Sequence, residues 1–153
     1  MPATTPCLWF DGQAEEAAAT YTALFPNSAT TAVTPGPDGK ALMVAFTLDG
    51  REFLALNGGP QFSFTEAVSF SIACADQAEV DHYWDGLLAG GGEESRCGWL
   101  KDRFGLSWQV VPQRLGELMA DPDPARAGRA GAALMGMSRI VVAELDAAAD
   151  GDG

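Results

Sequence analysis

Histidine and cysteine are scarce in this chain of 153 residues, which has one histidine and three cysteines. Cys7, Cys74 and Cys97 lie far apart, are odd in number and contain no CxxC pair. This pattern predicts neither a zinc knuckle nor a disulfide framework. We interpret each cysteine as a small buried hydrophobe rather than a nucleophile. The single histidine, His82, is expected on the exposed side of a helix.

Basic residues are also few, with nine Lys and Arg against 21 Asp and Glu and a formal net charge of −12. Nine scattered positive charges cannot form the stripe that neutralises a phosphate backbone. Nucleic acid is therefore not an expected partner. The negative charge predicts good solubility and indicates no particular substrate.

Long apolar runs are absent as well, since none approaches the roughly 20 residues that a membrane helix requires. Residues 1–6 show no basic segment followed by an apolar one, so no signal peptide is predicted. The expected protein is cytoplasmic, without a membrane partner. A hydrophobic content of 47% with 20% charged residues is typical of a globular domain, and this length allows one core without cross-links.

The first half of the chain predicts a strand, a helix and three strands. The apolar run 7–10 is too short for a helix and indicates a strand, after which Asp11 is expected to cap a helix. Pro26 ends that helix, and a weak strand follows at 29–34. The Asp-Gly pair at 49–50 joins two apolar runs, 41–48 and 51–56, in a predicted hairpin.

The second half repeats this order. Residues 68–74 alternate as a half-buried strand does, and Asp76 with Glu79 forms a capping-box pattern at the start of a helix. Further strands are expected at about 94–101 and 106–111. A shift of 63 positions superposes the apolar stripes of the two helices. We interpret this as an internal repeat of two βαβββ modules, the alternative being two unrelated α+β segments.

Residues after Pro112 are expected to be helical. Asp123-Pro124 is typical of an N-cap followed by proline in the first helical position, and Ser138 could cap a last helix. The expected organisation is one domain of 153 residues and of the α+β class. It comprises module 1 at about 4–60, module 2 at about 65–112 and a helical extension at 113–148.

Several segments strongly resemble the PhnB-like family, often labelled "3-demethylubiquinone-9 3-methyltransferase domain". That family belongs to the glyoxalase/bleomycin-resistance/dioxygenase (vicinal oxygen chelate) superfamily. The likeness extends from about residue 4 to residue 146. The segments that carry it are PCLWFDGQAEEA at 6–17, ALNGGP at 55–60, CGWLKD at 97–102, FGLSWQVVP at 104–112 and DPDP at 121–124.

The resemblance implies two βαβββ modules whose curled sheets surround a cleft, usually completed in a homodimer. It also implies a divalent metal held by His, Glu or Gln side chains in metal-dependent members. The corresponding positions here are Pro6, Phe53 or Ala55, Ser69 and Gln109. Gln109 alone could serve as a ligand there, so we predict no metal site and no cofactor.

Strand alternation predicts which side chains face the cleft. In each strand the larger apolar residues are assigned to the helix-covered face, which leaves small and polar residues on the other. The predicted ligand-binding residues are Asn57, Ser69, Ser71, Trp99, Ser107 and Gln109.

The leading hypothesis is a metal-free protein that binds a small molecule in this cleft, with no catalytic residue assigned. One alternative is a metal-dependent lyase, isomerase or dioxygenase-like enzyme that uses Gln109. A methyltransferase is disfavoured because neither 57–60 nor 90–92 is a glycine-rich loop between a strand and a helix. Lys101 could also lower the thiol pKa of Cys97, although a structural role for this cysteine is preferred.

Overall fold

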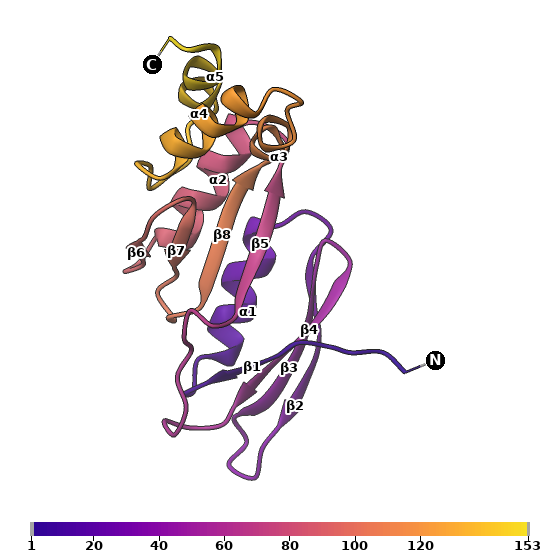
Figure 1. Ribbon diagram of the computed structural model, residues 1–153. Coiled ribbons are helices and arrows are strands. Elements are labelled where there is room, and N and C mark those ends of the chain that lie inside the picture. Colours follow the sequence, from indigo (N-terminus) through magenta and orange to yellow (C-terminus); the bar gives the residue numbers. More distant parts are fainter. Residues whose placement is uncertain (1, 153) are drawn as a thin grey trace. The chain divides into compact units, whose positions relative to one another are not determined.

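The computed structural model describes residues 2–152, and the chain divides into two compact units between Phe64 and Thr65. Each unit contains a strand, a helix and three further strands, and three helices follow at the C-terminal end (Figure 1). Each module has its own four-stranded mixed sheet. The predicted α+β class with two βαβββ modules and C-terminal helices is therefore confirmed.

The elements of the first unit are β1 (Cys7–Phe10), α1 (Ala14–Leu24), β2 (Ala29–Pro35), β3 (Ala41–Leu48) and β4 (Arg51–Asn57). The strand order is β1-β4-β3-β2, with β1 parallel to β4 and the other pairs antiparallel. The predicted hairpin is confirmed as β3 and β4, joined at Asp49-Gly50.

An aromatic cluster joins α1 to this sheet. The ring of Phe46 in β3 stacks on Phe53 in β4, with centroids 5.4 Å apart, and lies 6.3 Å from the ring of Tyr21 in α1. All three side chains are buried. They mark the face of the sheet that α1 covers.

The start of α1 differs from the prediction that Asp11 caps it. The N-cap residue is Gln13, whose side chain makes no capping hydrogen bond within the described residues. Instead, the side-chain oxygen of Asn57 accepts a hydrogen bond from the backbone N–H of Ala14 at 2.9 Å, and its amide donates to the carbonyl of Ala41 at 2.9 Å. The cap therefore comes from a strand 43 positions away.

Replacing Asn57 with alanine is expected to lower the free energy of unfolding by about 2 kcal/mol, because it leaves the buried Ala14 N–H and the Ala41 carbonyl without these partners. Chemical denaturation of both proteins measures the difference. Gln13→Ala is the control and should change stability by less than about 0.5 kcal/mol. Equal losses in the two variants would contradict the distant cap.

The elements of the second unit are β5 (Ser69–Cys74), α2 (Gln77–Leu88), β6 (Glu93–Glu94), β7 (Trp99–Lys101) and β8 (Ser107–Pro112). The strand order is β5-β8-β7-β6, with β5 parallel to β8 and the other pairs antiparallel. Asp76 caps α2 as predicted, since its carboxylate accepts from the N–H of Glu79 at 3.0 Å. The carboxylate of Glu79 accepts from the N–H of Ala75, one residue before the cap.

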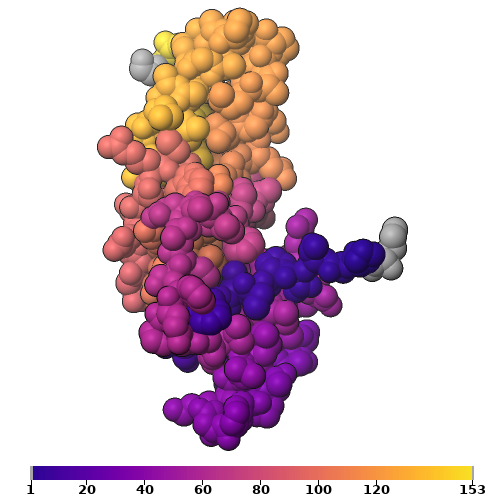
Figure 2. Space-filling model, turned by 60° about the horizontal axis from the view of Figure 1, so that its bottom comes forward, coloured from indigo at the N-terminus to yellow at the C-terminus, as the bar shows by residue number. Residues whose placement is uncertain are grey.

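The C-terminal helices are α3 (Gln113–Met119), α4 (Pro124–Leu134) and α5 (Val142–Asp150). Asp123 caps α4 and Pro124 occupies its first turn, as predicted. The prediction that Ser138 caps the last helix is wrong, because α5 begins only at Val142. Figure 2 shows the atoms of this region, orange to yellow, packed in one continuous body. Among the described residues, none of the helices has the length and apolar character needed to cross a membrane.

Candidate functional site

The face of the second sheet opposite α2 carries five of the six predicted ligand-binding residues. Alternation in β5 buries Ile72 and Cys74 on the side of α2, and leaves Ser71 exposed. Directly paired residues project from the same face of a sheet. The pairs Ser69–Ser107, Ser71–Gln109 and Trp99–Gln109 therefore place these five side chains together.

A hydrogen bond links two of the predicted residues across the parallel strands. The side-chain amide of Gln109 donates to the hydroxyl of Ser69 at 3.0 Å. Both side chains are half-buried. This bond fixes the Gln109 amide on this face.

On this face, Ser107 has a buried hydroxyl group without a hydrogen-bond partner among the described residues. The residue is 1% exposed. Ser107 also lines a cavity of about 170 Å³ together with Trp99 and Lys101. A buried polar atom without a partner typically costs about 1–3 kcal/mol.

An ion pair that the sequence did not predict borders the same cavity. The ammonium of Lys101 pairs with the carboxylate of Glu66, which precedes β5. Hydrogen bonding to Lys101 lowers the pKa of Glu66, and the same bond raises the pKa of Lys101. Alternation from Trp99 places Lys101 on this face, whereas no local pattern marks Glu66.

The turn between β7 and β8 is built around a buried carboxylate. Asp102 is 5% exposed and accepts hydrogen bonds from the backbone N–H groups of Phe104 and Leu106 and from the indole N–H of Trp108. These bonds lie between 2.9 and 3.1 Å. The turn thereby sets the positions of Lys101 and Ser107 at its two ends.

Asn57, the sixth predicted residue, does not lie on a sheet face opposite a helix. In β4 the buried residues are Phe53 and Ala55, so the expectation that they face the cleft is wrong. They are buried because the aromatic cluster packs against α1. In this strand, therefore, the larger side chains do not identify the face that the helix covers. Asn57 shares their side and borders a separate groove of about 790 Å³ in the first unit. Its role in ligand binding stays a prediction.

The prediction that the cysteines are buried is confirmed for Cys74 and wrong for Cys7, which is exposed, while Cys97 is half-buried. Burial raises the pKa of the Cys74 thiol to about 12, and partial desolvation also raises the pKa of Cys7. Cys97 lies before β7, not on the alternating face, and its sulfur is 3.9 Å from the sulfur of Met135. The ammonium of Lys101 is engaged with Glu66. Reactivity of Cys97 therefore has no support from a neighbouring base.

The residues at the family's metal positions do not fit a divalent ion. Pro6, Phe53 and Ala55 have no side-chain donor atoms, and Ser69 and Gln109 are hydrogen-bonded to each other. Within residues 2–152 no group of three or more His, Cys, Asp or Glu side chains is placed to hold a metal. Such sites require several nitrogen or oxygen ligands around one point.

The glycines that follow β4 pack against the indole ring of Trp9. They do not form a loop that could hold a nucleotide-like cofactor. The indole N–H of Trp9 donates to the carbonyl of Gly59 at 2.9 Å. A Cβ at Gly58 would lie 2.4 Å from ring carbons of Trp9, so glycine is required there for packing. Gly90, Gly91 and Gly92 follow the end of α2 and open no helix. Neither segment forms the loop expected for S-adenosylmethionine.

Comparison with known proteins places this geometry in a family. The profile of the family described as 3-demethylubiquinone-9 3-methyltransferase matches residues 2–111. None of the curated protein sequences matches the chain. Among solved structures, the PhnB protein from Bacillus cereus is 29% identical, with a TM-score of 0.67 over 72% of this chain and 99% of its own.

Two further structures show the same fold at lower identity. A protein from Pseudomonas aeruginosa is 19% identical, with a TM-score of 0.60 over 73% of this chain and 98% of its own. A gene product from Arabidopsis thaliana is 18% identical, with a TM-score of 0.51 over 71% of this chain and 96% of its own. Because the profile match spans well over half of the 153 residues, the chain belongs to the PhnB-like 3-demethylubiquinone-9 3-methyltransferase family.

Proposed function

We propose that this protein binds a small organic molecule on the face of its second sheet opposite α2, without a metal ion. The observation that carries the proposal is Ser107, a residue that lines a cavity and whose buried hydroxyl has no hydrogen-bond partner among the described residues. A ligand group that bonds to this hydroxyl would recover the interaction that the protein itself does not make.

The surroundings of Ser107 suggest the chemistry of such a ligand. The half-buried ring of Trp99 offers an apolar wall, and the amide of Gln109 is held close by. Glu66, Glu93 and Lys101 border the cavity, and the excess of carboxylates disfavours an anionic head group. We therefore expect a neutral or cationic hydrogen-bonding group attached to an apolar body.

The family name alone does not favour transfer of a methyl group by this chain. The residues at the expected metal positions and the glycine-rich segments fit neither a divalent ion nor S-adenosylmethionine. A binding function needs only the polar and aromatic groups that the second sheet presents. Homodimerisation stays a prediction; β2, exposed along its whole length, is an open sheet edge of the kind that partners cover.

Three probes with one ring and different head groups test the proposal: benzyl alcohol, benzylamine and benzoate. We expect the first two at millimolar concentration to shift the amide signals of residues 99–109 in two-dimensional NMR, and benzoate to bind more weakly. Absence of shifts there with all three probes would overturn the proposed site.

Ser107→Ala should separate stability from binding. Removing an unsatisfied buried hydroxyl is expected to raise the free energy of unfolding of the free protein by about 1 kcal/mol. The same change should weaken benzyl alcohol binding by about tenfold, the equivalent of one lost hydrogen bond. Denaturation and NMR titration measure the two effects. Ser71→Ala, on the same face but exposed, is the matched control and should leave stability unchanged. Unchanged binding in Ser107→Ala would contradict the role of the hydroxyl.

A further inference from the structure

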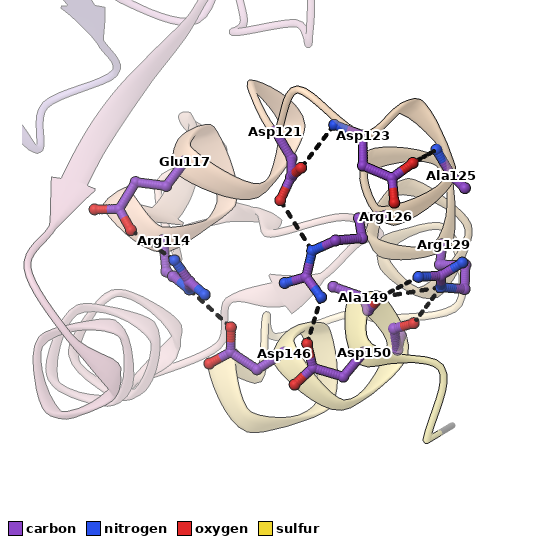
Figure 3. A network of polar contacts seen from close by, with 11 residues as sticks. Arg114, Glu117, Asp121, Asp123, Ala125, Arg126, Arg129, Asp146, Ala149 and Asp150 are labelled. Atoms are coloured by element: carbon purple, nitrogen blue, oxygen red, sulfur yellow. Dashed lines mark hydrogen bonds and ion pairs between the residues drawn. The ribbon is translucent and has the colours of Figure 1, made fainter.

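The C-terminal helices lie beyond residues 2–111 of the family match and have their own core and polar network. Figure 3 shows Arg114 between Glu117 of α3 and Asp146 of α5, and Arg126 between Asp121, which lies between α3 and α4, and Asp150 of α5. Arg114 pairs with Asp146 at 2.7 Å, and Arg126 pairs with Asp121 at 3.0 Å and with Asp150. Such partly exposed pairs contribute little each, but they connect α3, α4 and α5 as one layer. The core consists of Leu118, Ala130, Met137, Ile140, Leu145 and Ala149.

The segment between α4 and α5 makes main-chain contacts with the loop that precedes β7. The N–H of Cys97 donates to the carbonyl of Met137 at 2.7 Å, and the N–H of Gly98 donates to the carbonyl of Ser138 at 2.8 Å. Trp99 follows directly as the first residue of β7. Two consecutive hydrogen bonds from the C-terminal layer therefore hold the backbone that leads into Trp99.

Gly98 is enclosed between this segment and β8. Its carbonyl accepts a hydrogen bond from the N–H of Val110 at 2.7 Å. A Cβ at Gly98 would lie 2.8 Å from Ile140 and 2.9 Å from the Val110 carbonyl, and the residue has φ of +84°. Both the space and the backbone conformation require glycine, so any larger residue at this position must displace the Ile140 side chain or the loop.

The segment is itself anchored to α2. The side-chain amide of Gln77 donates to the carbonyl of Ile140 at 3.1 Å, and its oxygen accepts from the N–H of Val142 at 2.8 Å. Arg139 lies 3.4 Å from both Asp81 and Asp85 of the same helix. Gln77 thus connects α2 to the start of α5 without touching the ligand face.

We propose that residues 137–140 act as a brace that positions Trp99 on the ligand-binding face, with Gln77 as a positioning residue that acts through this segment. The proposal rests on the proposed function for the importance of Trp99, but the placement of the ring can be measured without a ligand. In this proposal the C-terminal helices help to shape the ligand-binding face, in addition to burying their own hydrophobic core.

Gln77→Ala tests the brace. We expect the amide protons of Cys97 and Gly98 to exchange with solvent about tenfold faster, because the segment that accepts their hydrogen bonds loses its anchor. The indole N–H signal of Trp99 should shift in the free protein, and the affinity for benzyl alcohol should fall severalfold. Gln113→Ala makes the same change at an exposed position of α3 and should alter none of these.

Gly98→Ala provides a second variant, since the added Cβ must displace either Ile140 or the loop. It should also shift the Trp99 indole signal. Unchanged exchange at Cys97 and Gly98 in Gln77→Ala, or an unshifted indole signal in both variants, would overturn the brace. Failure of the wild-type protein to bind any probe would count against the proposed function, while the exchange and indole measurements would still decide on the brace.

Discussion

Replacing Asp102 with alanine is expected to lower the free energy of unfolding of the second unit by about 4 kcal/mol. The carboxylate is buried and satisfies two backbone N–H groups and the indole of Trp108, all of which the variant leaves without that partner. Hydrogen bonds to a charged group contribute about 1.5–3 kcal/mol each, and breaking a buried charged network typically costs about 3–5 kcal/mol. Because the turn carries Lys101 and Ser107, probe binding should be lost together with stability.

Denaturation followed by the fluorescence of the tryptophans measures this loss. Asp102→Asn keeps one carbonyl oxygen as an acceptor and should cost about half as much. Asp11→Ala removes an exposed carboxylate and is expected to change stability by less than about 0.5 kcal/mol. A loss below about 1 kcal/mol in Asp102→Ala would show that the turn does not depend on this side chain.

Phe46→Ala should have a similarly large effect in the first unit, again about 4 kcal/mol. Its ring is 1% exposed, stacks on Phe53 and lies next to Tyr21, so truncation leaves a cavity between the sheet and α1. Neighbouring rings are too constrained by their own strands and helix to fill that space. Thermal and chemical denaturation are both suitable measurements.

Phe62→Ala is the natural comparison, because this ring is 67% exposed and contacts Trp9 at its edge. It should cost less than about 1 kcal/mol. If the two phenylalanine variants lost the same stability, the aromatic cluster would not be the core of the first unit. Phe46→Leu, which keeps more of the volume, should fall between them.

Features governed by neighbouring residues could be predicted from the sequence. The strand at 7–10, the hairpin joined at Asp49-Gly50, and the caps at Asp76 and Asp123 all depend on residues within a few positions of one another. The repeat of two βαβββ modules could also be recognised, because it is written as a pattern along the chain. Alternation placed Ser69, Ser71, Trp99, Ser107 and Gln109 on one face, where larger apolar neighbours identify the covered side.

Features that depend on residues far apart in the sequence could not be predicted from it. In β4 the large side chains Leu54 and Leu56 are the less buried set, because Phe53 and Ala55 pack under α1. The cap on Ala14 comes from Asn57, which removed the need for Asp11, and the segment that contains Ser138 runs along the loop before β7, so that α5 begins only at Val142. Each outcome was decided by a partner far away along the chain, which no local spacing reveals.

The sequence alone determines which side chains stand at the positions where metal-dependent members of the superfamily carry ligands. They are Pro6, Phe53 or Ala55, Ser69 and Gln109, among which only Gln109 is a usual ligand. The burial and the contacts of the proposed binding face, by contrast, could not be predicted from the sequence. Only the tertiary structure showed that the Ser107 hydroxyl is buried without a partner among the described residues, and that Glu66 pairs with Lys101 beside it. Burial and hydrogen-bond satisfaction depend on what surrounds an atom, and that is fixed by packing rather than by sequence neighbours.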